Sequence, residues 1–137
     1  MVAKKLLILT ALVETATGVM LLVSPTLVVA VLLGASLDAP AALVVARMAG
    51  AAVLSLGCAC WLARNDGPNR AVPWLVAAML LYNSVAVAVL ANAGAGMRLA
   101  GVLMWPAVAV HAVLAVWCIA CLRNGPANAA GRARTNS

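Results

Sequence analysis

Four long runs of apolar residues dominate the sequence, and each is long enough to cross the hydrocarbon core of a bilayer. A transmembrane helix needs about 20 mainly apolar residues, because each residue adds about 1.5 Å and the core is about 30 Å thick. The predicted spans are residues 6–23, 41–62, 71–91 and 99–122. Since they leave no stretch for a soluble domain, residues 1–122 are expected to form a single transmembrane domain.

The composition supports this interpretation. Of the 137 residues, 66% are hydrophobic and only 9% are charged, whereas a soluble domain is about 45–50% apolar and about 25% charged. Such a chain has too little polar surface to cover a soluble core, and it is too apolar to be disordered. Short connections require neighbouring spans to run antiparallel. We therefore predict an all-α, integral membrane four-helix bundle with up-down-up-down topology.

The segment between the first two spans is ambiguous. Pro25 removes a backbone donor and clashes with the preceding turn, so it ends or kinks the first helix. The following apolar stretch, residues 26–34, is too short to span a bilayer alone. It is expected either to prolong a kinked first helix or to lie as a short helix at the outer surface.

Basic residues flank the spans and predict their orientation. Three regions carry them, namely the N-terminus (Lys4, Lys5), the middle loop (Arg64, Arg70) and the tail (Arg123, Arg132, Arg134). With four spans these regions share one side, which the positive-inside rule identifies as the cytoplasm. The net charge of +6 therefore indicates orientation and membrane-lipid contact, with no nucleic acid as partner. We expect a multi-pass protein of the bacterial inner (cytoplasmic) membrane, N-in/C-in, with residues 123–137 as a polar, disordered cytoplasmic tail.

Polar side chains interrupt every span. Three are ionisable, Glu14, Arg47 and His111, and the third span contains Tyr82 and Asn83. Because an ionisable group in hydrocarbon costs at least about 2.5 kcal/mol, such residues usually face the interior of a bundle. In most of the spans, helical spacing places the polar residue on the same face of its own helix as several small residues. The second span has such a stripe of residues at positions 47, 51, 55 and 58, which we expect to face inward.

Two interpretations of these polar side chains remain open. In the first, Glu14 and Arg47 form a buried ion pair, while Asn83 and His111 hydrogen-bond across helices to hold the bundle together. In the second, the same residues and Tyr82 form a pocket that binds a small or lipophilic ligand or relays protons.

The four cysteines permit a further site. Cys58 and Cys60 are two residues apart, so one helix points them to nearly opposite sides. The best thiolate site would combine Cys58, Cys118 and Cys121, which would suit Cu(I). The alternative is that all four thiols pack as small apolar side chains. No nucleophile–base arrangement is evident, and neither an enzymatic activity nor a cofactor is expected.

Three segments carry a resemblance to known proteins: VETATG (13–18), ARMAGAAVLSLGCACW (46–61) and MWPAVAVHAVL (104–114). They resemble a group of small bacterial four-span membrane proteins, and the layout of the spans is similar to that of DoxX-like proteins. The resemblance implies the four-span architecture, and no activity comes with it.

The leading functional hypothesis is a non-enzymatic accessory or lipophilic-ligand-binding membrane protein. The first alternative is a small transporter or proton-coupled membrane subunit, and the second is a membrane thiol-redox or Cu(I)-binding protein. A homo-oligomer or a larger membrane complex is the expected assembly.

Overall fold

The computed structural model describes residues 2–66 and 71–124, which form five helices and, over these ranges, no strand. The helices are α1 (Val2–Val23), α2 (Pro25–Leu33), α3 (Pro40–Ala63), α4 (Ala71–Ala95) and α5 (Met104–Arg123). All except α2 are long and apolar enough to cross a membrane. The prediction of an all-α chain with four candidate spans is thus confirmed. Residues 67–70 of the middle loop and the predicted tail beyond residue 124 lie outside the described residues.

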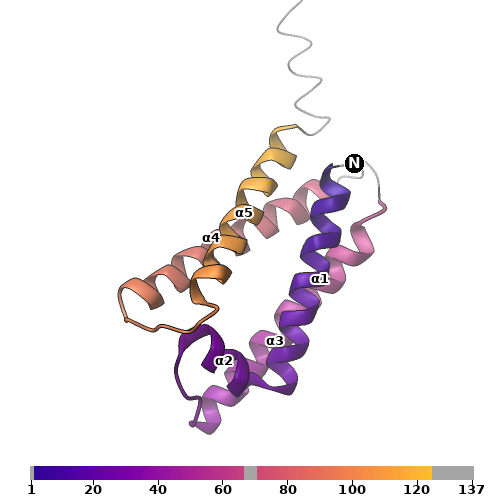
Figure 1. Cartoon of the computed structure of the whole chain (residues 1–137). Coiled ribbons are helices and arrows are strands. Elements are labelled where there is room, and N and C mark those ends of the chain that lie inside the picture. Colours follow the sequence, from indigo (N-terminus) through magenta and orange to yellow (C-terminus); the bar gives the residue numbers. More distant parts are fainter. Residues whose placement is uncertain (1, 67–70, 125–137) are drawn as a thin grey trace, which may run out of the picture.

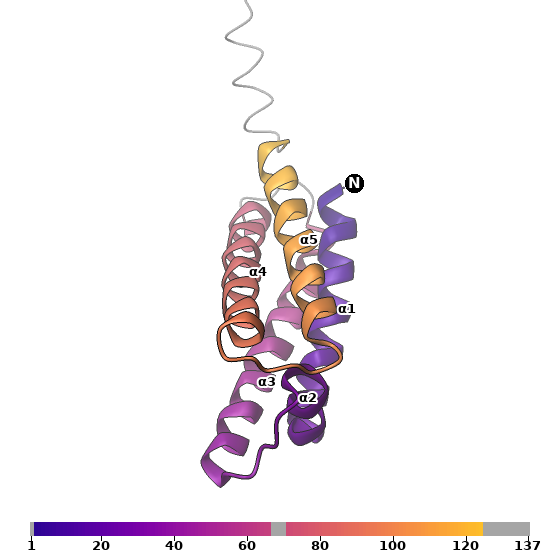
Figure 2. The ribbon, with the colours of Figure 1, turned by 60° about the vertical axis from the view of Figure 1, so that its left-hand side comes forward.

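The long helices are arranged as two pairs. Helix α1 packs mainly against α3, and α4 packs mainly against α5 (Figure 1). The pairs meet chiefly through α1 and α5, whereas α3 contacts α4 only slightly. The start of α1 and the end of α5 lie at the same end of the molecule (Figure 2).

Glycines allow the α1–α3 pair to pack closely. A Cβ atom added to Gly18 would lie 2.6 Å from the backbone nitrogen of Leu54, and one added to Gly57 would lie 2.8 Å from the backbone nitrogen of Thr15. Helix backbones approach this closely only where side chains are absent. Association within a bilayer depends on such van der Waals contact, because lipid removes the hydrophobic driving force between helices.

An apolar core joins α1 to the second pair. Its largest members, Leu6, Leu7, Met79 and Leu114, are 2% exposed or less. The buried residues of α4 follow a helical period of three and four, so one face of that helix turns towards α1 and α5. This core lies directly beside the buried polar residues.

Helix α2 is a separate element, and the loop between α4 and α5 docks on its end (Figures 1 and 2). The Leu103 N–H donates to the Val31 carbonyl at 2.9 Å, and the backbone of Gly101 lies against Leu32. This docking holds residues 99–103 out of the helix. Helix α5 therefore begins at Met104, later than the span predicted from hydropathy.

Gly34 ends α2 in the left-handed conformation, with a φ of 66°. An added Cβ would lie 3.0 Å from the carbonyl carbon of Ala100. We expect Gly34→Ala to lower the free energy of unfolding by about 1 kcal/mol, because the left-handed region is strained for a residue with a Cβ. Unfolding followed by circular dichroism in detergent micelles measures this change, and a variant as stable as the native protein would contradict it.

Candidate functional site

Polar side chains of three helices, buried or half-buried, meet where the two helix pairs join. Glu14 of α1 is 1% exposed, and its Oε2 accepts a hydrogen bond of 3.2 Å from the Tyr82 hydroxyl of α4. The Tyr82 ring lies beside the His111 ring of α5, with centroids 5.9 Å apart and planes inclined at 55°. We call these three residues the polar cluster, together with two buried neighbours along the same helices, Thr10 one turn before Glu14 and Asn83 directly after Tyr82.

The hydrogen bond of His111 determines which ring nitrogen carries hydrogen. Nδ1 lies 2.7 Å from the Ala107 carbonyl oxygen, one turn back in the same helix. Because a carbonyl oxygen can only accept, Nδ1 must donate. In the neutral ring Nε2 is then left as an acceptor, and the ring plane is held against Tyr82.

The side-chain amide of Asn83 has a hydrogen-bond partner for its nitrogen but, among the described residues, none for its oxygen. Its Nδ2 donates to the Met79 carbonyl at 2.7 Å, again within its own helix. Its Oδ1 has no hydrogen-bond partner among the described residues, although the residue is 0% exposed.

Two further buried atoms of the cluster have no partner in the described part of the chain, namely Glu14 Oε1 and Thr10 Oγ1. Thr10 precedes Glu14 by four residues, so both lie on one face of α1. A buried polar group without a partner typically costs about 1–3 kcal/mol. All three unpaired oxygens accept hydrogen bonds, and the cluster is thus complementary to a molecule that carries N–H or O–H groups.

Arg47 does not belong to this cluster. Its side chain is exposed, and it forms no ion pair with Glu14. The predicted ion pair between Glu14 and Arg47 is therefore wrong. The Glu14 carboxylate accepts a hydrogen bond from the Tyr82 hydroxyl instead.

The predicted inward stripe of α3 is also wrong. Arg47, Ala51, Ser55 and Cys58 are all exposed, whereas Gly50, Gly57 and Cys60 are the buried residues of this helix. The close approach of α1 demands glycine at the contact, so α3 turns its glycine face inward. Ser55 can face outward because its hydroxyl donates to the Ala51 carbonyl at 2.8 Å within the same helix.

Four of the polar residues selected from the sequence lie in or beside one site. The structure brings Glu14, Tyr82 and His111 into contact, and Asn83 is next to Tyr82 in α4. Thr10 was expected to face inward, because it lies one turn before Glu14 on the same stripe of the first span, and the structure buries it. It was not selected as a site residue. A threonine hydroxyl usually bonds to its own helix, so the sequence alone provides little reason to single it out.

The cysteines of the described residues do not form the predicted thiolate site. Cys60 and Cys118 are buried in the apolar core, Cys121 is half-buried, and Cys58 is exposed; all four thiols are free. Among residues 2–66 and 71–124, no three His, Cys, Asp or Glu side chains are grouped so that they could hold a metal ion. The structure thus does not bring Cys58 together with Cys118 and Cys121.

Comparison with known proteins adds no relative. No protein-family model matches the chain, and no curated protein or solved structure does. The class is defined by the fold and the hydropathy, which indicate a small helical membrane protein with four candidate spans. Its distinguishing feature is the polar cluster between the two helix pairs.

Proposed function

We propose that this chain is a non-enzymatic, multi-pass protein of the bacterial inner membrane that binds a small lipophilic molecule at the polar cluster. The observation that carries the proposal is the set of three buried oxygens on Thr10, Glu14 and Asn83 that have no partner among the described residues. Most buried polar atoms in proteins have a hydrogen-bond partner, so three without one require an explanation. A bound molecule with hydroxyl or amino groups would satisfy them.

In this proposal the spans run up-down-up-down, with both ends in the cytoplasm. The positive-inside rule supports this orientation through Lys4 and Lys5 at the start of α1 and Arg64 after α3. The ligand enters from the bilayer between α3 and α4, which contact each other only slightly. Its apolar body lies among the helices, and its donor group meets Glu14 Oε1 and Thr10 Oγ1.

Mass spectrometry of lipophiles that co-purify in mild detergent tests the proposal. We expect the native protein to retain a hydroxylated or aminated lipophile, and Thr10→Val to retain about tenfold less. One lost hydrogen bond amounts to about 1.4 kcal/mol, which is tenfold in affinity.

Ser84→Ala is the matched control, because Ser84 is exposed on α4 and its hydroxyl donates to the Leu80 carbonyl of its own helix. Identical retention by the native, Thr10→Val and Ser84→Ala proteins would rule out binding at the cluster.

A second function is favoured by two successive contacts, the Glu14–Tyr82 hydrogen bond and the Tyr82–His111 ring contact. Together they connect α1 to α5 through α4. Such a series of ionisable and hydroxyl groups is what proton transfer within a membrane requires. In this alternative the chain is a proton-coupled membrane subunit. Reconstituted vesicles containing a pH-sensitive dye distinguish the two functions, because a passive binder conducts no protons and a His111→Ala change would abolish genuine flux.

A further inference from the structure

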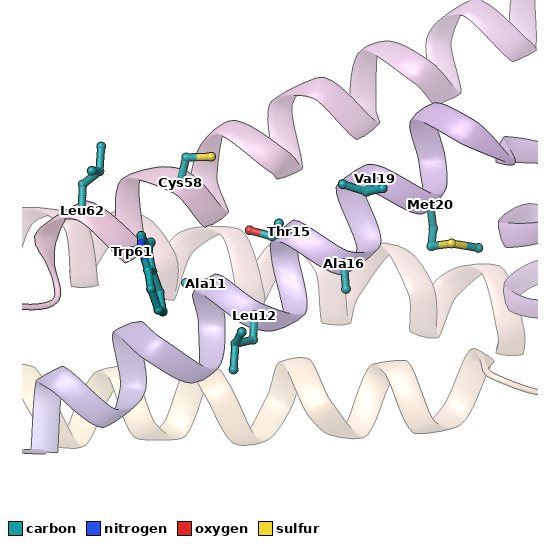
Figure 3. Close-up of a pocket in the computed structure, with 9 residues that line it drawn as sticks. All are labelled: Ala11, Leu12, Thr15, Ala16, Val19, Met20, Cys58, Trp61 and Leu62. Carbon is teal, nitrogen blue, oxygen red and sulfur yellow. The ribbon is translucent and has the colours of Figure 1, made fainter.

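A second candidate site lies on the outer side of the α1–α3 pair, away from Glu14. It is an apolar groove of about 810 Å³ between the two helices (Figure 3). Helix α1 lines it with a stripe that includes Leu12, Ala16 and Val19, and the end of α3 contributes Cys58, Trp61 and Leu62. The lining is almost wholly apolar, so the groove suits a hydrocarbon chain.

A basic side chain lies at one end of this groove. The guanidinium carbon of Arg64 is 3.8 Å from the ring centroid of Trp61, and Arg64 also donates to the Trp61 carbonyl. Because a guanidinium has five N–H donors, several remain for an anion. Trp61 thus presents its ring to the groove, with a cation stacked over it.

Lysine extends the positive charge along α1. Lys5 lies on the same helical face as Leu12, Ala16 and Val19, and about 10 Å from Leu12 towards the N-terminus. It is exposed, as is Lys4. The start of α1 and the end of α3 lie at the same end of the molecule (Figure 1). The described residues at these two helix ends include three basic residues, Lys4, Lys5 and Arg64, and one acidic residue, Asp66. The net charge there is therefore positive.

We propose that the groove binds an anionic glycerophospholipid. An acyl chain lies along Val19, Ala16 and Leu12, and the phosphate meets Arg64 and Lys5 at the membrane surface. The groove is complementary to such a lipid. Its apolar lining would contact the acyl chain, and its cationic end would contact the anionic phosphate. Arginine stacked on an aromatic ring suits phosphate recognition because its planar fork binds two oxygens at once.

A second copy of the chain is a poorer occupant. Two copies related by an axis normal to the membrane would bring their Lys5 and Arg64 side chains together at the same level. Like charges placed opposite each other oppose association. An anionic lipid removes that repulsion.

Quenching of tryptophan fluorescence by brominated lipids tests the proposal. A protein whose only tryptophan is Trp61 is reconstituted in phosphatidylcholine vesicles that contain a minority of brominated phosphatidylglycerol or brominated phosphatidylcholine. We expect Trp61 to be quenched with a preference of about thirtyfold for the anionic lipid, since Lys5 and Arg64 each contribute about 1 kcal/mol near an anionic headgroup. A protein that retains only Trp74, exposed at the start of α4, is the matched control and should show no preference.

Variants locate the effect. Lys5→Gln with Arg64→Gln should abolish the preference without altering the helical core, and Ala16→Phe should fill the groove and reduce quenching by both lipids. Equal quenching of Trp61 by the two lipids, or a preference that survives the double change, would overturn the proposal. So would weak quenching by both lipids together with oxidative cross-linking of Cys58 between copies, which would assign the groove to a second copy.

Discussion

Replacing Gly18 by leucine is expected to separate α1 from α3 and to lower the free energy of unfolding by about 3 kcal/mol. The new Cβ would lie 2.6 Å from the Leu54 nitrogen and 2.8 Å from the Gly50 carbonyl oxygen, both backbone atoms. Backbone cannot move aside as a flexible side chain can, so one helix must shift as a whole. Overpacking of a well-filled interior typically costs about 1–3 kcal/mol. We expect the upper end of this range, because a shift of one helix disturbs contacts along the whole α1–α3 interface.

Unfolding by sodium dodecyl sulfate in mixed micelles, followed by circular dichroism, measures this loss. Ala59→Leu is the matched control, because Ala59 is exposed on α3 and tolerates a larger side chain there. If the two variants were equally stable, the close approach of α1 and α3 would not determine the stability of the fold.

The second large effect runs in the opposite direction. The double change Glu14→Met and Tyr82→Phe is expected to raise the free energy of unfolding by about 1–3 kcal/mol, because the buried Glu14 carboxyl and its half-buried hydroxyl donor are replaced by apolar groups of similar volume. The change also removes the unpaired Glu14 Oε1. The same protein should retain none of the co-purifying lipophile. The double change would therefore increase stability and abolish binding.

Thermal unfolding and mass spectrometry of a single preparation measure both quantities. Tyr82→Phe alone serves as the control, since it deprives the Glu14 carboxyl of its hydroxyl donor and should destabilise the protein. A double variant that is less stable than the native protein would show that the cluster serves the fold rather than a ligand.

Hydropathy was sufficient to predict the four long helices, because span length and apolar content are properties of each segment by itself. It was also sufficient to select Glu14, Tyr82, Asn83 and His111, whose polarity conflicts with their surroundings. The start of α5 was misplaced because residues 99–103 are as apolar as a helix but dock on α2 as a loop.

The orientation of α3 could not be predicted from polarity. Arg47 and Ser55 suggested one face, but the contact with α1 selects the face of Gly50 and Gly57. Choosing between them requires knowing how closely two particular helices approach. For the same reason no sequence pattern indicated the groove, which exists only between two helices in a fixed relative position.

The tight α1–α3 contact also has a consequence for biosynthesis. Both helices precede α4 in the chain, and chains generally fold from the N-terminus as they are made. The glycine-lined pair can therefore assemble while the second half is still on the ribosome. During that interval Glu14 waits without its hydroxyl donor, since Tyr82 arrives only with α4. The first half of the chain can thus pair its helices before the hydroxyl that hydrogen-bonds the Glu14 carboxylate has been synthesised.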